Sequence, residues 1–369
     1  MRITFVIIGA VVTAGIIGQM PLGESRALGQ VKKSDENAPT TEIEKLIKQL
    51  GSASAVAREK ASKALLKIGV DALPLLKSAM KSNDTEIRRR AELLNAEIYE
   101  AWIRARADRA AKYGIDVVVE RMVRKRNDLP EDDWQVLGRI IETVRDEGRA
   151  QGATPAKNLP HREGFHKMAT QIAPEIKENY GFRASRLIAE DITTGHGIGG
   201  SLVVNGGKTK TATGSTVSIV IANGDVYWGG PAIASIIICD GNISVMGARG
   251  SILIARERIK IRSAVGTKDN VIHENYSKGF SHIRFFSVRD LGIQLAGGDG
   301  NQVGVINVDK DSLFGNAGFK VGDLIASING EKITESEDAR AMLRRGMADG
   351  NIVVGLHGNG SQIKVHIPW

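Results

Sequence analysis

A short motif that recurs at nearly equal intervals in the second half of this chain restricts its fold more than any other feature. Four short apolar runs, each led by a serine, begin at Ser201, Ser218, Ser235 and Ser251. A glycine-containing turn pair, such as Asn223-Gly224, follows each of the first three runs. A nearly constant period that keeps the residue type at each offset indicates stacked, equivalent units.

Two architectures satisfy this repeat, which we expect to span residues 184–280. In a short parallel β-helix each unit forms one coil, so the serines form a ladder and the apolar runs are buried on both faces. In an antiparallel meander, pairs such as Asn223-Gly224 would instead close type I′ hairpins. We favour the parallel β-helix and keep the meander as the alternative. The coil length and the glycine-rich corners resemble the bactofilin type of solenoid, and Cys239 is expected to be a small buried hydrophobe.

The first helical region, residues 41–112, contains a second repeat with a constant offset. The matched pairs are Leu46 and Leu76, Leu50 and Met80, Arg58 and Arg88, Ala61 and Ala91, and Ile68 and Ile98. Pro74 and the two arginine-centred motifs stand where HEAT repeats carry a proline and V-R-x-x-A, so the region resembles two HEAT repeats. Thr41, with Glu44 three residues later, is expected to cap the first helix. Because two repeats bury little surface, a long helix over 85–112 is expected to complete their core.

Residues 113–183 are expected to form a second helical region. The spacing of apolar residues favours helices at about 115–126, 131–149 and 163–179, with a proline-containing loop between the last two. Basic residues accumulate between Arg88 and Arg126, across both helical regions, and are expected to form a solvated helix face, with an anionic docking surface as the alternative.

The N-terminus has the pattern of a secretory signal peptide, residues 1–27. A basic residue precedes an apolar run over residues 3–18, and Ser25 and Ala27 place small side chains at −3 and −1 of a cleavage point. An uncleaved membrane anchor formed by residues 3–18 is the alternative, because this run is long for a signal peptide yet short of a membrane span. We therefore expect export to the periplasm or cell envelope, with residues 28–40 as a linker.

Charge and cysteine content narrow the expected partners and cofactors. The net charge of +8 would suggest nucleic acid as the partner of an intracellular chain, but for an exported chain we expect none. Anionic membrane or cell-wall surfaces are the partners expected instead. A basic surface that is only solvated, with no partner, is the further alternative. A lone cysteine excludes an intrachain disulfide and a cysteine-based metal site.

Two further motifs give no reason to expect a metal or a cofactor. His161 and His166, with Glu163 between them, lack the i,i+4 spacing of a zinc helix. The segment Gly195 to Gly200 matches G-x-G-x-x-G but precedes a strand instead of opening a helix. We therefore predict a flexible entry to the β-region there.

Three motifs occur in order near the C-terminus. They are Asp290-Leu291-Gly292-Ile293-Gln294-Leu295, the segment from Ala317 to Ile325, and Ile328-Asn329-Gly330. These motifs stand where the PDZ family has G-L-G-F, A-G-L-x-x-G-D-x-I and V-N-G, so residues 285–369 resemble a PDZ domain, which has an α+β fold. The whole chain is thus expected to be a multi-domain α and β protein, with an α-helical repeat region, a central parallel β-helix and a C-terminal PDZ domain.

The resemblance to PDZ domains implies a peptide-binding groove. The residues expected to form it are Leu291, Gly292, Ile293, Gln294, Leu295, Arg340 and Leu343. Backbone N–H groups of the first three would form a nest for a carboxylate, and the strand that follows would offer its edge to an extended peptide. Asp290 stands where eukaryotic members carry glycine, which argues against capture of a terminal carboxylate unless Arg289 offsets its charge. A PDZ fold kept only for packing or dimerisation is the alternative.

No catalytic constellation accompanies these motifs. No serine between residues 185 and 361 lies in a G-x-S-x-G or G-N-S-G-G context, and the preceding region lacks the pattern of a two-barrel protease. We therefore expect a non-enzymatic, exported scaffold or adaptor that binds extended or C-terminal segments of a protein partner. The alternative is an accessory factor that presents substrates to a separate envelope protease. An enzyme with its site in the β-region is disfavoured because the predicted strands lack clustered carboxylates.

Overall fold

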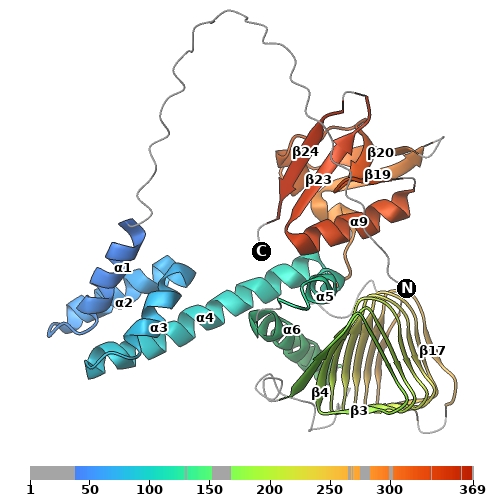
Figure 1. The fold of residues 1–369 in the computed structure, drawn as a ribbon, viewed down its shortest axis with the longest axis horizontal. Helices are drawn as coiled ribbons and strands as arrows, with labels where there is room; N and C mark the ends of the chain where they lie inside the picture. The colour runs from blue at the N-terminus through green and yellow to red at the C-terminus, as the bar shows by residue number, and fades with distance from the viewer. Residues whose placement is uncertain are drawn as a thin grey trace, which may run out of the picture.

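The structure is a computed structural model in which a helical region, a three-sided β-solenoid and an α+β region follow one another (Figure 1). It describes residues 38–128, 131–151, 168–264, 267, 269–274, 283–298, 302–333, 335–358 and 360–367. The predicted signal peptide, most of the predicted linker, and the pair His161 and His166 lie outside these residues. Within the described part, none of the helices combines the length and the hydrophobicity needed to cross a membrane.

The N-terminal helices pack around one small apolar core. The elements are α1 (Ala38–Gln49), α2 (Ala55–Ile68), the 3-10 helix η1 (Gly69–Ala72), α3 (Leu73–Ala79) and the long helix α4 (Thr85–Tyr113). Asp84 caps α4 by accepting hydrogen bonds from the N–H groups of Glu86 and Ile87. The cap predicted at Thr41 is wrong, because α1 begins three residues earlier and Thr41 lies inside it.

Equivalent contacts recur at matched positions of the repeat in these helices. The Arg58 side chain donates to the carbonyl of Ser52 at 2.7 Å, and the Arg88 side chain donates to the carbonyl of Ser82 at 2.8 Å. In each repeat the arginine side chain is thus hydrogen-bonded to the turn that precedes its own helix. These two equivalent bonds give the predicted repeat a physical basis. Membership of the HEAT family stays a prediction.

Two shorter helices connect this region to the solenoid. They are α5 (Ile115–Arg124) and α6 (Glu131–Ala150), close to their predicted positions. The helix predicted over 163–179 is wrong, because β1 (Ala169–Ile172) and β2 (Glu175–Glu178) lie there and pair in parallel with the next coil. The solenoid therefore begins at Ala169 instead of 184, and the prediction of helix up to 183 fails over this first coil.

The solenoid has three parallel sheets, one on each side of a triangular cross-section (Figure 1). The first sheet contains β1, β4 (Ser185–Ala189), β7 (Leu202–Asn205), β10 (Ile219–Ala222), β13 (Ile236–Cys239), β16 (Ile252–Ala255) and β18 (Val271–His273). The second contains β2, β5 (Asp191–Thr194), β8 (Thr209–Thr211), β11 (Val226–Trp228), β14 (Ile243–Val245) and β17 (Ile259–Ile261). The third contains β3 (Phe182–Arg183), β6 (Ile198–Gly199), β9 (Ser215–Thr216), β12 (Ala232–Ile233) and β15 (Ala248–Arg249).

Parallel pairing between successive coils confirms the β-helix and shows that the alternative, the antiparallel meander, is wrong. Ile219 pairs with Leu202 on one side and with Ile236 on the other, so the register advances by one repeat per coil. The resemblance to bactofilins stays a prediction.

The predicted serine ladder is present and fully buried. The N–H of Ser201 donates to Ser218 Oγ at 3.4 Å, that of Ser218 to Ser235 Oγ at 3.2 Å, and that of Ser235 to Ser251 Oγ at 3.1 Å. Each hydroxyl thus satisfies a backbone donor at a corner where the coil leaves one sheet and enters the next.

Glycine at another corner allows coils to stack closely. A Cβ atom at Gly197 would lie 1.9 Å from the carbonyl oxygen of Gly214 in the next coil. The segment from Gly195 to Gly200, predicted to be a flexible entry, is therefore part of one of the regular coils. Its glycines allow the backbone of the neighbouring coil to approach closely.

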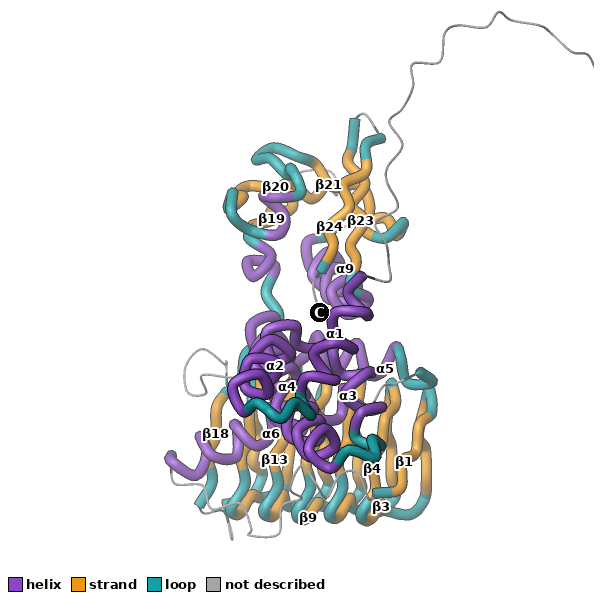
Figure 2. The backbone as a smooth tube through the Cα atoms, turned by 90° about the vertical axis from the view of Figure 1, so that its left-hand side faces the viewer, coloured by secondary structure: helices purple, strands orange, loops and turns teal. Residues whose placement is uncertain are grey.

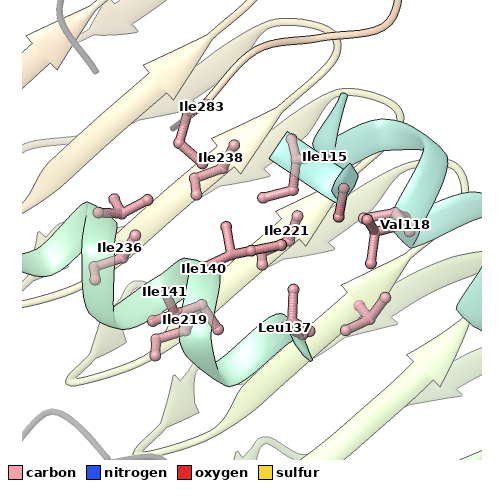
Figure 3. Close-up of a cluster of buried hydrophobic side chains, with 14 of the residues drawn as sticks. Ile115, Val118, Leu137, Ile140, Ile141, Ile219, Ile221, Ile236, Ile238 and Ile283 are labelled. Carbon is pink, nitrogen blue, oxygen red and sulfur yellow. The ribbon is translucent and has the colours of Figure 1, made fainter. Parts of the chain in front are cut away.

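The first sheet has an apolar core on each of its faces, which explains its runs of consecutive apolar residues. Outward-facing side chains such as Ile219 and Ile221 pack against α5 and α6, as Figure 3 shows for Leu137 and Ile140 of α6. Side chains from the alternate positions fill the solenoid interior, where Trp228 is fully buried. Figure 2 shows α6 crossing the strands of this sheet.

Cys239 lies in the interior core of the solenoid, as predicted. Burial raises the pKa of its thiol to about 12.

The C-terminal region is an antiparallel sheet packed on one main helix. Its elements are the 3-10 helix η2 (Val288–Leu291), β19 (Ile293–Gly298), β20 (Gln302–Val308), α8 (Leu313–Asn316), β21 (Leu324–Ile328), β22 (Glu331–Lys332), α9 (Ser336–Asp349), β23 (Asn351–Leu356) and β24 (Gln362–His366). The sheet order is β19-β20-β21-β23-β24, which leaves β19 at an edge. Tyr113 of α4 and Val117 of α5 belong to the same core, so this region is completed by the helices that precede the solenoid.

Candidate functional site

A cavity of about 350 Å³ lies beside the edge strand β19, next to α9. In Figure 1, α9 runs beneath β19 and β20. The residues that line the cavity are Arg256, Ser287, Val288, Arg289, Ile293, Gln294, Leu295, Ile306 and Arg340. Five parts of the fold therefore meet here: η2 with its preceding turn, β19, β20, α9, and the solenoid turn between β16 and β17. We call this cavity the β19 groove.

Four of the seven residues predicted for the site line the β19 groove. Ile293, Gln294 and Leu295 contribute the β19 side, and Arg340 contributes the α9 side. Leu291 and Leu343 do not line it, because both are fully buried in the core of the α+β region.

The predicted amide nest is not preformed. Gly292 adopts the left-handed conformation, with φ 78°, and closes η2 by donating its N–H to the carbonyl of Arg289 at 2.9 Å. That donor is therefore already used within the turn. A Cβ atom at this position would also lie 1.9 Å from Ser312 Cβ, so glycine is required here for packing.

Asp290 serves the turn instead of the β19 groove. Its carboxylate accepts a hydrogen bond from the N–H of Ser287 at 2.9 Å, completing a capping box, and pairs with the Arg284 guanidinium. Burial raises the pKa of this carboxyl, and the Ser287 N–H and Arg284 oppose that rise. Asp290 is absent from the residues that line the groove, so its charge does not oppose an anionic ligand there in the way that the sequence raised as a concern.

Arg340 connects the β19 groove to a buried charge network. Its guanidinium donates to the carbonyl of Phe286 at 3.0 Å, to Asp116 of α5 at 3.3 Å, and to Asp240 of the solenoid at 3.2 Å. Arg344, one turn later on α9, lies 2.7 Å from the same Asp240 and 3.6 Å from Asp116. Three regions that are far apart in the sequence are therefore joined behind the groove.

The carboxylates of this network are deeply buried. Asp116 is 0% exposed in its side chain and accepts a hydrogen bond from the N–H of Phe286 at 2.7 Å. Burial, together with the nearby charge of Asp116, raises the pKa of Asp240 to about 7, although Arg340 and Arg344 oppose the rise. Of the carboxyls that hold this junction, Asp240 is thus the one whose raised pKa lies near neutral pH.

Two groove residues lack a local sequence signal that would identify them. Ile306 reaches the groove from β20, and Arg256 reaches it from a different region of the fold. The one indication for Arg256 is that Arg256-Glu257 stands where the earlier coils carry a glycine-containing turn pair. A side chain at that corner projects from the solenoid, and the fold places it beside α9.

A larger cavity, of about 610 Å³, lies on the third sheet of the solenoid. Glycines 181, 197, 199 and 214 form much of its lining, and Arg183 and His196 are its ionisable residues. Both side chains are exposed, and nothing in their hydrogen bonding points to a ligand. We therefore take the β19 groove as the candidate site.

Comparisons with known proteins bear on the C-terminal region. The model of the PDZ domain family matches residues 304–356. The PDZ domain of EpsC from Vibrio cholerae is a similar solved structure, with 20% sequence identity over 21% of this chain and 95% of that chain, and a TM-score of 0.17. No match to a curated protein was found. The family match, together with the edge strand β19 and the helix α9 beside it, shows that the C-terminal region of this chain is a PDZ domain.

Proposed function

We propose that this chain is a non-enzymatic scaffold or adaptor that binds extended segments of partner proteins in the β19 groove. The observation that carries the proposal is the position of β19. It lies at the edge of the PDZ sheet, and three of its residues line the groove. An edge strand beside a groove is the arrangement in which a peptide adds to a sheet, with backbone hydrogen bonds giving affinity and side-chain pockets giving selectivity.

The remainder of the chain supports a scaffolding role. The solenoid is rigid by construction, since each coil pairs with its neighbours along three sheets. The helices α4 to α6 join the solenoid to the PDZ domain through shared cores. A segment bound at β19 would thus be held at a set position relative to the solenoid and the N-terminal helices.

The proposal places this scaffold outside the cytoplasm, in the periplasm or cell envelope. Its support is the sequence pattern of residues 1–27. Fusing these residues to a reporter enzyme that is active only after export tests this part independently of peptide binding. Activity of the fusion supports export, and retention of an inactive reporter in the cytoplasm contradicts it.

Peptide binding is tested with a library of random 12-residue peptides and the full chain. The isolated PDZ region is unsuitable because Tyr113 and Val117 complete its core. We expect peptides to be enriched, and Ile306→Ser to weaken them about tenfold, because that side chain is an apolar wall of the groove.

Val321→Ser is the matched control. Val321 is an exposed aliphatic residue of the same domain that does not line the groove. We expect this change to leave peptide affinity within about twofold of the original value. Enrichment of no peptide, or equal effects of the two substitutions, would contradict binding in the β19 groove.

A further inference from the structure

We propose that the β19 groove selects segments that carry an acidic side chain, held by Arg256 of the solenoid together with Arg289 and Arg340 of the PDZ domain. This inference rests on the proposed function, because it names the chemistry of the segment that binds there. It makes the binding site a composite of two regions of the chain.

The composition of the groove lining carries the inference. Among the described residues, nine line the groove; three of them are arginines and none is a carboxylate. The remaining lining residues are apolar or uncharged. Guanidinium groups bind carboxylates through charge-assisted, often bidentate hydrogen bonds, so an acidic side chain is the complementary ligand.

Burial separates the two signs of charge at this junction. The side chains of Arg256 and Arg340 are 38% and 24% exposed, whereas the Asp240 side chain that pairs with both is 3% exposed. Asp116, behind Arg340, is completely buried. The carboxylates therefore lie beneath the guanidiniums, and the surface that a ligand meets is positive.

Counting the charged groups leaves a positive excess. Asp116, Glu120 and Asp240 are balanced by three arginines of the network, which are Arg256, Arg340 and Arg344. Arg289 is exposed at the groove and has no acidic partner among the described residues. An incoming carboxylate would supply the missing negative charge.

Hydrogen-bond donors remain for such a ligand. Of the Arg256 nitrogens, only Nη1 is engaged by a described residue, where it donates to Asp240 at 3.1 Å. Arg340 uses Nε and Nη2 for Phe286, Asp116 and Asp240, which leaves Nη1 without a bond to any described residue. These bonds also hold both guanidiniums in place, so they are oriented before a ligand arrives.

The turn before β19 favours a side-chain carboxylate over a chain terminus. The N–H of Gly292 already donates to the carbonyl of Arg289, so the backbone nest that would receive a terminal carboxylate lacks one of its donors. Recognition of negative charge is thereby left to the arginine side chains.

The test uses peptides enriched by the full chain and measures their affinity by fluorescence polarisation. Each peptide is compared with versions in which Glu or Asp is replaced by Gln or Asn, and with a version amidated at its C-terminus. We expect neutralising the acidic side chain to weaken binding about tenfold, and amidation to change it less than about twofold. The double variant Arg256→Gln with Arg289→Gln, which retains Arg340, should lose most of the preference for the acidic peptide.

Two further variants guard against a loss of structure. Arg258→Gln removes a neighbouring exposed arginine that does not line the groove, and should retain the preference. The double variant Arg256→Lys with Arg289→Lys keeps both positive charges, and it should retain most of the preference for the acidic peptide.

The outcomes separate this inference from the proposed function. Peptides that bind in an Ile306-dependent manner without an acidic preference, or with a preference that the double Gln variant leaves undiminished, overturn the inference and leave the proposed function standing. Binding that is lost on amidation but not on Glu→Gln replacement also overturns it, since the terminus would then be the recognised group. A library that yields no peptide overturns both.

Discussion

Ser235 occupies the middle of the buried ladder that runs along one corner of the solenoid. Its Oγ accepts a hydrogen bond from the N–H of Ser218 and donates one to the carbonyl of Ile233 at 2.9 Å. Ser235→Ala would leave a buried backbone donor without a partner, which costs about 1–3 kcal/mol of unfolding free energy. Urea denaturation measures this loss.

Ser244→Ala is the control, because the Ser244 Oγ is buried but has no hydrogen-bond partner among the described residues. We expect this change to alter the free energy of unfolding by less than about 0.5 kcal/mol. Equal losses for the two variants would mean that the ladder hydrogen bonds contribute nothing specific.

At the candidate site, sequence reasoning identified the strand but misassigned part of the helix. Arg340 and Leu343 are three residues apart, so helical geometry places them on one face. Which part of that face meets the core and which part meets the groove depends on how α9 packs, and the structure buries Leu343 while Arg340 lines the groove. The predicted backbone nest for a carboxylate is not formed for a local reason. The N–H of Gly292 donates to the carbonyl of Arg289 within η2 and is not free for a ligand.

The first sheet of the solenoid is covered on both of its faces by described side chains. Ile238 of β13 points outward, yet it is fully buried in the core shared with α5 and α6. Ile238→Ala should therefore cost about 2–5 kcal/mol, as at any interior position. Chemical denaturation of the full chain measures the loss.

Ile233 of β12 provides the matched control, because it is an isoleucine on an uncovered sheet of the same solenoid and is 38% exposed. Ile233→Ala should cost less than about 1 kcal/mol. A small loss at both positions would contradict the packing of the helices on the first sheet.

The apolar runs predicted the strands of the first sheet because their pattern repeats coil after coil. The first coil escaped prediction, since β1 and β2 lack a serine-led apolar run and place Ile172 and Ile176 four residues apart, a spacing typical of a helix. Pairing with the next coil decides its structure, and such non-local pairing is invisible in a short window of sequence.

For the whole molecule, the decisive contacts join residues that are remote in the sequence. Arg340 lies 224 residues after Asp116 and 100 residues after Asp240, and no local pattern indicates these pairs. The sequence predicted three regions and their order, but not the junction that makes the groove a composite of two of them. Burial and charge pairing across that junction could be recognised only in the folded chain.

The stability of this junction should depend on pH through Asp240. Its pKa is raised from an ordinary value of 3.8 to about 7, so between these values the folded state binds more protons than the unfolded state. This group's contribution to the unfolding free energy should therefore fall as the pH rises from about 4 to about 7. The groups facing it are Asp116, Arg256, Arg340 and Arg344.

Asp240→Asn isolates this contribution. The difference between the urea midpoints of the original chain and the variant, followed from pH 4 to pH 7.5, should shift steadily against the original chain as the pH rises. A difference that stays constant, or that shifts in favour of the original chain, would contradict the raised pKa.

The central claim is that an extended segment adds to the edge of β19. Hydrogen–deuterium exchange of the full chain, with and without an enriched 12-residue peptide, tests it most directly, because a paired strand shields the backbone N–H groups of its neighbour. We expect new protection concentrated in residues 293–298, with little change in the strands of the solenoid. A peptide that binds but leaves β19 unprotected, or that protects another surface instead, would contradict the account.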